Sequence, residues 1–219
     1  DLGCLGAAVN TRAMERQLEI LKEMGCNGIR TSHNPPAPEL LDLCDRMGFI
    51  VMDEAFDIWK VKKTDFDYSL DFDEWHRRDI EAMVLRDRNH PSVFIWSIGN
   101  EVMEQWERDG SGEAIATELA GIVRSLDDTR PVTAACNDPV PYNPVIASGA
   151  LDLIGYNYRD TLWTRFPQAF PEGKFIGTET TSALATRGSY DMPSEIVRRW
   201  PARWDQPFRD GNADLTCSA

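Results

Sequence analysis

Two glutamates directly follow apolar segments, and their positions suggest carboxylate chemistry. Glu101 ends the segment "VFIWSIGNE" and Glu179 ends "KFIGTE". A buried strand that stops at a carboxylate places that group at the carboxyl edge of a sheet, where barrel enzymes assemble their sites. Two carboxyls about 5 Å apart at such an edge can cleave a glycosidic bond with retention, one as acid/base and the other as nucleophile.

Each glutamate also has an ordinary interpretation. In a chain with 36 acidic residues, a single glutamate is more often a helix-capping neighbour or an ion-pair partner than a catalyst. Glu101 has the stronger context, because the glycine just before "NE" leaves room for close approach and Asn100 carries a donor that could hold a sugar hydroxyl. Glu179 alone is a weaker signal, and sequence spacing does not show that the two meet. The hypothesis therefore rests on the pair.

Other polar side chains stand at the ends of further apolar segments. Arg30 and His33 lie at the end of "NGIRTS", and His33 precedes the rigid turn "NPPAP", which favours a positioned donor. Asn157 and Tyr158 follow "LDLIGY". Because the carboxyl ends of parallel strands meet at one edge of a sheet, we expect these residues beside the two glutamates.

The three histidines do not form a recognisable metal-binding motif. No HxH or HExxH spacing occurs, so a metal-dependent hydrolase lacks its usual ligands. His90, in "RNHPS" before a strand, is expected at the opposite end of the sheet in a structural role. His76 lies in a charged helical segment and is expected to be exposed.

Several aromatic residues lie near strand ends. Their flat apolar faces could stack on sugar rings. Trp96 lies inside a strand, so it fits the core equally well. The candidates are Trp59, Trp96, Tyr156, Tyr158 and Trp163.

Strand-like and helix-like segments alternate along the chain. The strand-like segments are apolar throughout rather than alternating, which is typical of a sheet with both faces covered and predicts a parallel α/β fold. The helical segments show 3.6-residue periodicity, and glycines close the first two. The expected strands span 27–32, 49–53, 93–97, 131–136, 151–157 and 174–179, and the main helices 11–25, 38–47, 71–87 and 111–127.

Two parallel α/β architectures fit this order, an open doubly wound sheet and a (β/α)₈ TIM barrel. No GxGxxG or Walker-type loop follows any strand, so nothing supports a nucleotide-binding switch point. Polar or ionisable groups end strand after strand, which favours the barrel. Six strands are fewer than eight, so we expect an incomplete barrel over residues 1–200 and an irregular tail over residues 201–219.

Composition limits the possible partners. The net charge of −13 disfavours nucleic acid and anionic membrane surfaces, since the excess of Lys and Arg that neutralises phosphate is missing. No apolar run approaches the roughly 18 residues of a membrane span, and the chain opens without the basic flank of a signal peptide. Five cysteines without a CxxC pair favour buried reduced thiols over a disulfide framework.

Two segments carry a resemblance to a known family. "NGIRTSHNPP" and "RNHPSVFIWSIGNEV" resemble the signature segments of glycoside hydrolase family 2, which contains β-galactosidases, β-glucuronidases and β-mannosidases. "LLDLCDRMGFIVMDEAFDIW" and "FIGTETTSALATRGSY" are similar to the same family's catalytic barrel. The likeness extends over nearly all of residues 1–200 and is strongest to β-galactosidase-like members.

The resemblance implies a role for each candidate residue. Glu101 would be the general acid/base and Glu179 the nucleophile of a retaining exo-β-glycosidase. Asn100 would hold the sugar 2-hydroxyl. With Asn157 from the neighbouring strand end, the predicted substrate-binding residues are Arg30, His33, Asn100, Asn157 and Tyr158.

The resemblance also carries expectations about cofactors and missing parts. In well-known β-galactosidases, a Glu-x-His pair shortly after the strand that ends in "DEA" helps to hold a magnesium ion, whereas this chain reads "DEAFDIWK" there. We therefore expect neither a metal nor another cofactor. Asp57 could bind sugar instead. The family's N-terminal β-sandwich domains and its last barrel strand are not in this chain, which is expected to be a fragment. The whole protein could form a homo-oligomer in a bacterial cytoplasm or periplasm.

Three alternatives stay open at this point. The sugar could be a β-glucuronide or β-mannoside, because specificity depends on loops and domains outside this chain. A non-catalytic carbohydrate-binding barrel would keep the fold without turnover, although both glutamates are present. A metal-dependent barrel hydrolase is the third alternative, and the small number of histidines disfavours it.

Overall fold

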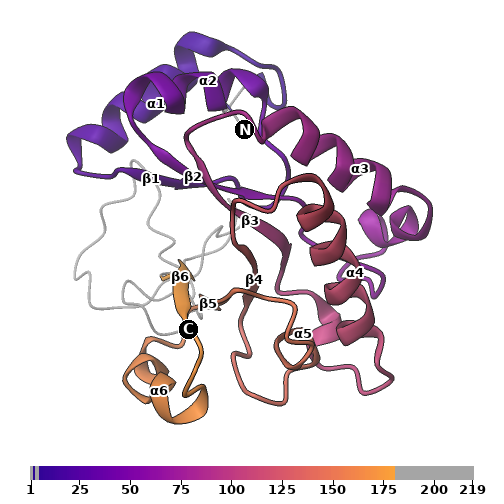
Figure 1. The fold of residues 1–219 in the computed structure, drawn as a ribbon. Coiled ribbons are helices and arrows are strands. Elements are labelled where there is room, and N and C mark those ends of the chain that lie inside the picture. The colour runs from indigo at the N-terminus through magenta and orange to yellow at the C-terminus, as the bar shows by residue number, and fades with distance from the viewer. Residues whose placement is uncertain (1, 3–4, 181–219) are drawn as a thin grey trace, which may run out of the picture.

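A computed structural model describes residue 2 and residues 5–180 of the chain. All six strands are parallel and pair in chain order, so each strand is hydrogen-bonded to the next one along the sequence. Sequential parallel pairing curls the sheet into an arc (Figure 1), as in an incomplete (β/α)₈ barrel. The strands are β1 (Gly28–Arg30), β2 (Ile50–Glu54), β3 (Val93–Asn100), β4 (Val132–Cys136), β5 (Leu153–Asn157) and β6 (Phe175–Glu179).

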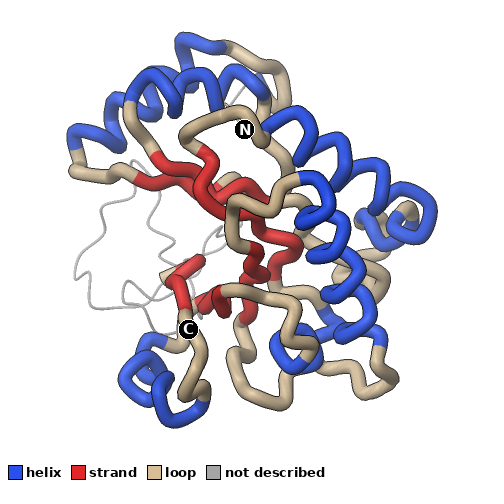
Figure 2. Tube along the Cα trace, in the orientation of Figure 1, coloured by secondary structure: helices blue, strands red, loops and turns tan. Residues whose placement is uncertain are grey.

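The helices lie around the outside of this arc (Figure 2). The first two helices end at glycines as expected, with Gly25 and Gly48 at φ of 88° and 76°, a conformation that a side chain disfavours. The α-helices are α1 (Thr11–Glu23), α2 (Pro38–Met47), α3 (Phe72–Asp87), α4 (Ser111–Leu126), α5 (Pro144–Ala147) and α6 (Phe166–Ala169). Three 3₁₀ helices, η2 (Tyr68–Leu70), η3 (Met103–Gln105) and η4 (Asp160–Arg165), complete the described elements.

Strand β3 is longer than its apolar segment predicts. It continues past Ser97 through Gly99 to Asn100, so the backbone delivers Asn100 and Glu101 to the edge of the sheet. A glycine is required at 99, because an added Cβ would lie 2.9 Å from the indole Nε1 of Trp59. The glycine thus allows Trp59 to pack directly beneath the residues that end the strand.

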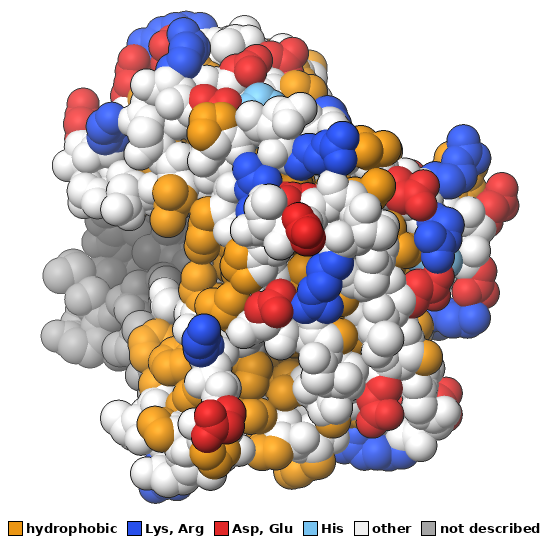
Figure 3. All heavy atoms as spheres, in the orientation of Figure 1, with side chains coloured by type: hydrophobic (Ala, Val, Ile, Leu, Met, Phe, Trp, Pro, Cys, Tyr) orange, Lys and Arg blue, Asp and Glu red, His pale blue; other side chains and the backbone are white. Residues whose placement is uncertain are grey.

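Among the described residues, a hollow lies between the two outer strands of the arc. This hollow of about 350 Å³ is lined by β1, β2 and β3 on one side and by residues Ile176 to Thr178 of β6 on the other. Figure 3 shows hydrophobic side chains gathered over this middle part of the molecule, while charged side chains concentrate over the helices at the top and right. The described lining of this hollow is therefore largely apolar.

Three of the five aromatic residues that could stack on sugars are buried instead: the expectation is wrong for Trp59 and Tyr156, whereas Trp96 takes the core position that was its equal alternative. Trp59 and Trp96 are 0% exposed and Tyr156 is 1% exposed. Their polar atoms have internal partners: the indole of Trp59 donates to Ile98 O at 2.8 Å and that of Trp96 to Asp127 Oδ2 at 3.0 Å. These rings form the core between the sheet and its helices.

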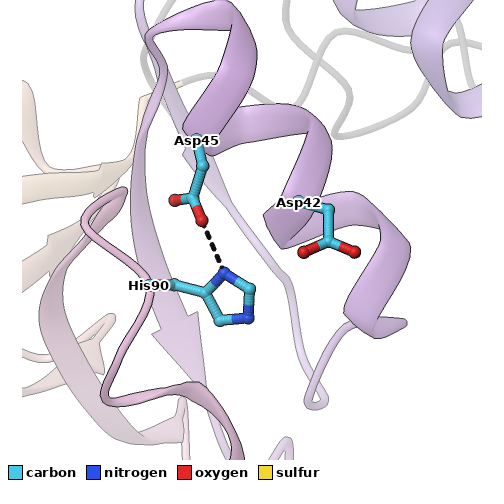
Figure 4. Close-up of side chains that lie close together, drawn as sticks. All are labelled: Asp42, Asp45 and His90. Atoms are coloured by element: carbon cyan, nitrogen blue, oxygen red, sulfur yellow. Dashed lines mark hydrogen bonds and ion pairs between the residues drawn. The ribbon is translucent and has the colours of Figure 1, made fainter.

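His90 and Asp45 hold the start of β3, at the end of the strand opposite Asn100. Asp45 Oδ2 lies 2.7 Å from His90 Nδ1, and Asp45 Oδ1 accepts the backbone N–H of Ser92 at 2.9 Å. Figure 4 shows Asp42 on the same helix, near the free edge of the imidazole. One Asp45 oxygen binds the imidazole of His90 and the other binds the backbone at the start of the strand. Both residues therefore have a structural role, as expected of His90.

The expectation that His76 is exposed is wrong. Its ring stacks on Phe72 with centroids 4.7 Å apart, and Nδ1 lies 2.6 Å from Phe72 O. Nε2 faces Glu118 of the neighbouring helix α4 at 3.3 Å. The charged sequence around His76 does not predict this burial, because it depends on a contact with α4, which is distant in the sequence.

The cysteine prediction holds within the described residues. Cys26, Cys44 and Cys136 are free thiols, and the last two are buried. Burial raises the pKa of Cys44 to about 11 and that of Cys136 to about 12, so both stay protonated. The remaining cysteines, the predicted boundary at residue 200 and the predicted tail lie outside the described residues. No helix in the described part of the chain is long and apolar enough to cross a membrane.

Candidate active site

The ends of the six described strands, or the residues just after them, supply the candidate site, with Asn137 directly after β4. Arg30 ends β1, Glu54 ends β2, Asn100 ends β3, Asn157 ends β5 and Glu179 ends β6. Parallel pairing brings these ends to one edge, and Asn157 lies directly opposite Glu179 in the β5–β6 register. The fold thus converts positions up to 149 residues apart into contacts, as between Arg30 and Glu179.

Arg30 is the central cation of the site. Its Nη1 donates to Glu179 Oε1 at 2.8 Å, and its Nη2 donates to Asn100 Oδ1 at 2.8 Å. Glu54, which is 0% exposed, accepts from Arg30 Nε at 3.0 Å and Nη2 at 2.9 Å. A buried carboxylate is tolerable only when paired in this way. Arg30 therefore links the two outer strands of the arc and holds Glu179 in place.

His33 lies between the same two carboxylates. Its Nδ1 is 2.8 Å from Glu54 Oε1 and its Nε2 is 3.7 Å from Glu179 Oε1. The hydroxyl of Ser97 donates to the other oxygen of Glu54 at 2.7 Å. Glu54 thereby orients both Arg30 and His33, and the imidazole edge is left partly open to the site.

Glu179 is surrounded by groups that favour its charged form. The hydroxyl of Tyr158 donates to Glu179 Oε2 at 2.6 Å, and Arg30 binds Oε1. Burial opposes ionisation, but the hydrogen bonds from Tyr158 and Arg30 and the charge of Arg30 outweigh it and lower the pKa of Glu179. Glu179 is therefore an ionised carboxylate at neutral pH, as a nucleophile requires.

Glu101 has the opposite electrostatics. Burial raises the pKa of Glu101, and the negative charge of Glu179 raises it further, against a hydrogen bond from Asn157. Asn157 Nδ2 donates to Oε1 at 2.7 Å and Asn137 Nδ2 donates to Oε2 at 3.2 Å. The residue adopts a positive φ of 44°, unusual for glutamate, so the backbone turns sharply to present this carboxyl.

Asn100 connects the site to a second charged pair. Its Nδ2 donates to Asp57 Oδ1 at 2.9 Å, and Lys63 Nζ donates to the same oxygen at 2.9 Å and to Asn100 O at 2.9 Å. Burial opposes ionisation of Asp57, but the hydrogen bonds from Asn100 and Lys63 lower its pKa. The Lys63 ammonium already supplies positive charge beside Asp57, so this segment does not fit a divalent cation.

Glu104 fixes the loop that carries Lys63. Its Oε1 accepts the backbone N–H groups of Lys60 at 2.8 Å and Val61 at 2.7 Å, and the residue is 0% exposed. Lys63 follows two residues later in the chain. The β3–α4 connection therefore holds the β2–α3 connection against the site.

All seven residues chosen from the sequence lie in one hydrogen-bonded cluster. Sequence reasoning did not assign site roles to three members of it, Glu54, Lys63 and Asn137. Glu54 and Asn137 do end or follow strands, so the strand-end signal could have found them. The seven residues chosen are Arg30, His33, Asn100, Glu101, Asn157, Tyr158 and Glu179.

One strand-end carboxylate does not belong to the site. Asp53 precedes Glu54 in β2, and successive side chains of a strand face opposite sides of a sheet. Asp53 is 0% exposed and faces helix α3, where burial and the charge of Asp87 raise its pKa. Its Oδ1 lies 3.5 Å from the hydroxyl of Thr31, on the outer side of the strand.

The fold and this cluster together define a class of protein. An arc of parallel strands wrapped by helices, with ionisable groups at the carboxyl ends of the strands, is the architecture of a (β/α)₈-barrel enzyme domain. Residues 3–175 match the family described as glycosyl hydrolases family 2, TIM barrel domain. The chain belongs to this family, as the two signature segments predict.

Similar proteins are known at the level of sequence and structure. The chain is 56% identical over 248 residues to the β-galactosidase BoGH2A of Bacteroides ovatus, in a match that covers 100% of this chain and 29% of that protein. It is 34% identical over 153 residues to the β-glucuronidase of Sus scrofa, covering 67% of this chain and 22% of that enzyme. The chain thus spans less than a third of the length of these relatives.

Solved structures give the same result. A glycosyl hydrolase family 2 member from Bacteroides cellulosilyticus superposes with a TM-score of 0.78 at 42% identity, covering 84% of this chain and 23% of that one. The β-glucuronidase of Bacteroides uniformis superposes with a TM-score of 0.68 at 25% identity, covering 84% and 24%. Both superpositions cover most of this chain and about a quarter of each solved chain.

Proposed function

We propose that this chain is the catalytic barrel of a retaining exo-β-glycosidase that hydrolyses terminal β-D-galactosides. One observation carries the proposal. Glu101 and Glu179 are joined through Asn157, Asn100 and Arg30 by hydrogen bonds of 2.7, 2.9, 2.8 and 2.8 Å. The surroundings raise the pKa of Glu101 and lower that of Glu179. Two carboxyls whose pKa values are pushed apart in one site are suited to acid and nucleophile roles.

In the first step of the proposed reaction, Glu179 attacks the anomeric carbon of the sugar. A covalent bond forms between a Glu179 oxygen and that carbon while the glycosidic C–O bond breaks. Glu101 donates its proton to the departing oxygen, so the leaving group departs as an alcohol and Glu101 becomes a carboxylate.

In the second step, water hydrolyses the glycosyl-enzyme. Glu101, now ionised, removes a proton from the water as its oxygen bonds to the anomeric carbon, and the bond to Glu179 breaks. Two inversions give net retention. The raised pKa of Glu101 suits both tasks, since a group that acts as acid and then as base works best with a pKa near the working pH.

The remaining polar groups would bind the sugar. Asn100 Nδ2 donates to Asp57 Oδ1 at 2.9 Å and lies 3.5 Å from His33 Nε2, and its second amide hydrogen would bind the 2-hydroxyl group in place of the longer contact. His33, Tyr158 and Asn157 would line the rest of the subsite, with Arg30 holding Glu179 at the anomeric carbon. No metal or other cofactor has a part in this scheme.

The charge pattern favours a neutral sugar over a uronic acid. A glucuronide would bring a carboxylate that needs a cation. Among the described residues, Arg30 already binds Glu54 and Glu179 and Lys63 already binds Asp57, and Arg159 at the rim donates to Asn137 O. The name of the Bacteroides ovatus relative, a β-galactosidase, points the same way. The β-glucuronidase relatives make glucuronides the alternative to exclude.

A panel of nitrophenyl β-glycosides tests the proposal in the full-length protein. We expect the galactoside to exceed the glucuronide and mannoside by at least tenfold in kcat/KM, a discrimination of about 1.4 kcal/mol. NMR of the first product should show the β-anomer. Glu101→Ala and Glu179→Ala should lose activity while Glu113→Gln, an exposed glutamate on α4, keeps it. No turnover of any glycoside would support a non-catalytic binding module instead.

A further inference from the structure

Two carboxamides contact Glu101, and each could in principle present either of its ends. Asn157 Nδ2 lies 2.7 Å from Glu101 Oε1 and Asn137 Nδ2 lies 3.2 Å from Oε2. The NH₂ end of an amide donates and the oxygen end accepts. The other hydrogen-bond partners of each amide decide which end faces Glu101. Those partners lead in turn to groups that can only donate a hydrogen bond.

The amide of Asn157 is held at both ends, through Asn100 and Arg30 at its NH₂ and through Thr178 at its oxygen. A guanidinium only donates, so Asn100 must turn its Oδ1 toward Arg30 Nη2, 2.8 Å away. That oxygen also accepts Asn157 Nδ2 at 2.9 Å. On the far side, the hydroxyl of Thr178 donates to Asn157 Oδ1 at 2.6 Å. Asn157 therefore presents its NH₂ to Glu101, and Thr178 occupies the acceptor that a flip would turn inward.

The amide of Asn137 is fixed through a backbone group. The N–H of Asp138 donates to Gln105 Oε1 at 3.2 Å, and Asn143 Nδ2 reaches the same oxygen at 3.4 Å. Gln105 must then point its Nε2 at Asn137 Oδ1, which lies 2.7 Å away. Gln105 and Asn143 are both 0% exposed, so water does not offer Gln105 another partner. Asn137 therefore also presents its NH₂ to Glu101.

These two series of hydrogen bonds leave Glu101 with two amide neighbours that donate hydrogen bonds to its carboxylate. Resting on the proposed acid/base role, we propose that Thr178 and Gln105 are positioning residues that keep both amides turned donor-first toward Glu101, so that its acid proton is offered to the leaving-group oxygen. Neither amide, so oriented, can accept the O–H of protonated Glu101. An amide that flipped would place a carbonyl oxygen against that O–H and hold the proton away from the substrate.

The same flip would alter the titration of Glu101. Losing a donor to the carboxylate and gaining an acceptor for the acid both favour the protonated form, so the pKa of Glu101 would rise. The charged and titratable groups that face it are Glu179, Lys63, His33 and the buried thiol of Cys136. None of them is changed by replacing Thr178 or Gln105.

Thr178→Val tests the proposal in the full-length enzyme, since it removes the hydroxyl and keeps the shape. For the preferred sugar, we expect kcat/KM to fall about tenfold more with an alkyl glycoside than with a dinitrophenyl glycoside, because only the poor leaving group needs the proton. The basic limb of the pH profile should move to higher pH. Thr178→Ser should restore both. Thr133→Val is the matched control, since that buried strand hydroxyl binds Leu153 O instead.

If Thr178→Val does not fold, Gln105→Met gives the same comparison through the hydrogen bonds that hold Asn137. Equal losses on both leaving groups with an unmoved basic limb, in either folded variant, would overturn the positioning role. That result differs from failure of the proposed function, which would appear as Glu101→Ala showing no dependence on the leaving group.

Discussion

The hydroxyl of Tyr158 donates a 2.6 Å hydrogen bond to Glu179 Oε2, while Arg30 binds the other oxygen of that carboxylate at 2.8 Å. The backbone N–H of Tyr158 also donates to Glu179 O at 2.6 Å, and Tyr158 has a positive φ of 58°. The end of β5 is therefore shaped around the carboxylate that ends β6. The contact keeps Glu179 ionised and fixes its orientation.

Tyr158→Phe should move the acidic limb of the kcat/KM profile to higher pH. In the proposed mechanism activity requires ionised Glu179, so kcat/KM should rise with pH through the pKa of that group. The tyrosine hydrogen bond favours the charged form and lowers this pKa, and removing it raises the pKa. A profile measured from pH 4 to 9 checks the sign. A limb that stays in place or moves down would mean that Tyr158 does not act on the nucleophile.

Glu101→Ala should affect substrates according to their leaving groups. Without an acid, kcat/KM for alkyl glycosides should fall by roughly 10²- to 10⁴-fold, whereas dinitrophenyl glycosides, which leave without a proton, should retain most of the first step. Azide should accelerate the second step by replacing the water that Glu101 activates. Steady-state kinetics on a series of aryl glycosides measures this, and a uniform loss across the series would argue against an acid role.

Chelation should leave the enzyme active. Lys63 donates to Asp57 Oδ1 at 2.9 Å, and the proposed mechanism uses no divalent ion at this carboxylate. Dialysis against EDTA should change kcat/KM by less than about twofold, within the error of such comparisons. Loss of activity with recovery on adding Mg²⁺ would show that residues outside the described part of the chain supply a metal site.

Two glycine-to-alanine substitutions should change stability in opposite directions. A Cβ at Gly155 in β5 would lie 2.5 Å from Ala134 O and 2.9 Å from Ala135 Cα, and the resulting strain should cost roughly 1–3 kcal/mol. Gly121, exposed within α4, has no heavy atom within 4 Å of an added Cβ, so alanine should stabilise by up to about 1 kcal/mol. Thermal unfolding midpoints compare the two, and a destabilised Gly121→Ala would contradict the helix geometry.

Much of the fold was predictable because its signals are local. Helix α4 follows from apolar periodicity, and Leu119 and Ile122 are buried as that pattern predicts. The short helices α5 and α6 gave no periodic signal, since four residues make a single turn. Helix α2 buries Leu41, Leu43 and Cys44, whereas Leu40 is only partly buried. Tertiary packing around α2 decides which of its leucines are covered, and the sequence of the helix alone does not show this.

The candidate site was predictable where a residue ends a strand, and not where it acts from a distance. Glu101 and Glu179 stand at strand ends, so topology alone brings them to one edge. The strand-end rule could not decide between Asp53 and Glu54, which face opposite sides of β2. Lys63 reaches Asn100 from a loop, and nothing in its local sequence indicates that contact.

The central claim is that Glu179 attacks the sugar, and covalent trapping tests it most directly. A 2-deoxy-2-fluoro-β-galactosyl fluoride should inactivate the full-length enzyme by slowing both steps while allowing the first to occur. Mass spectrometry of the digested protein should find the fluorosugar on the peptide that contains Glu179, with no label in a Glu179→Gln variant. Label on Glu101 or on any other residue would contradict the account.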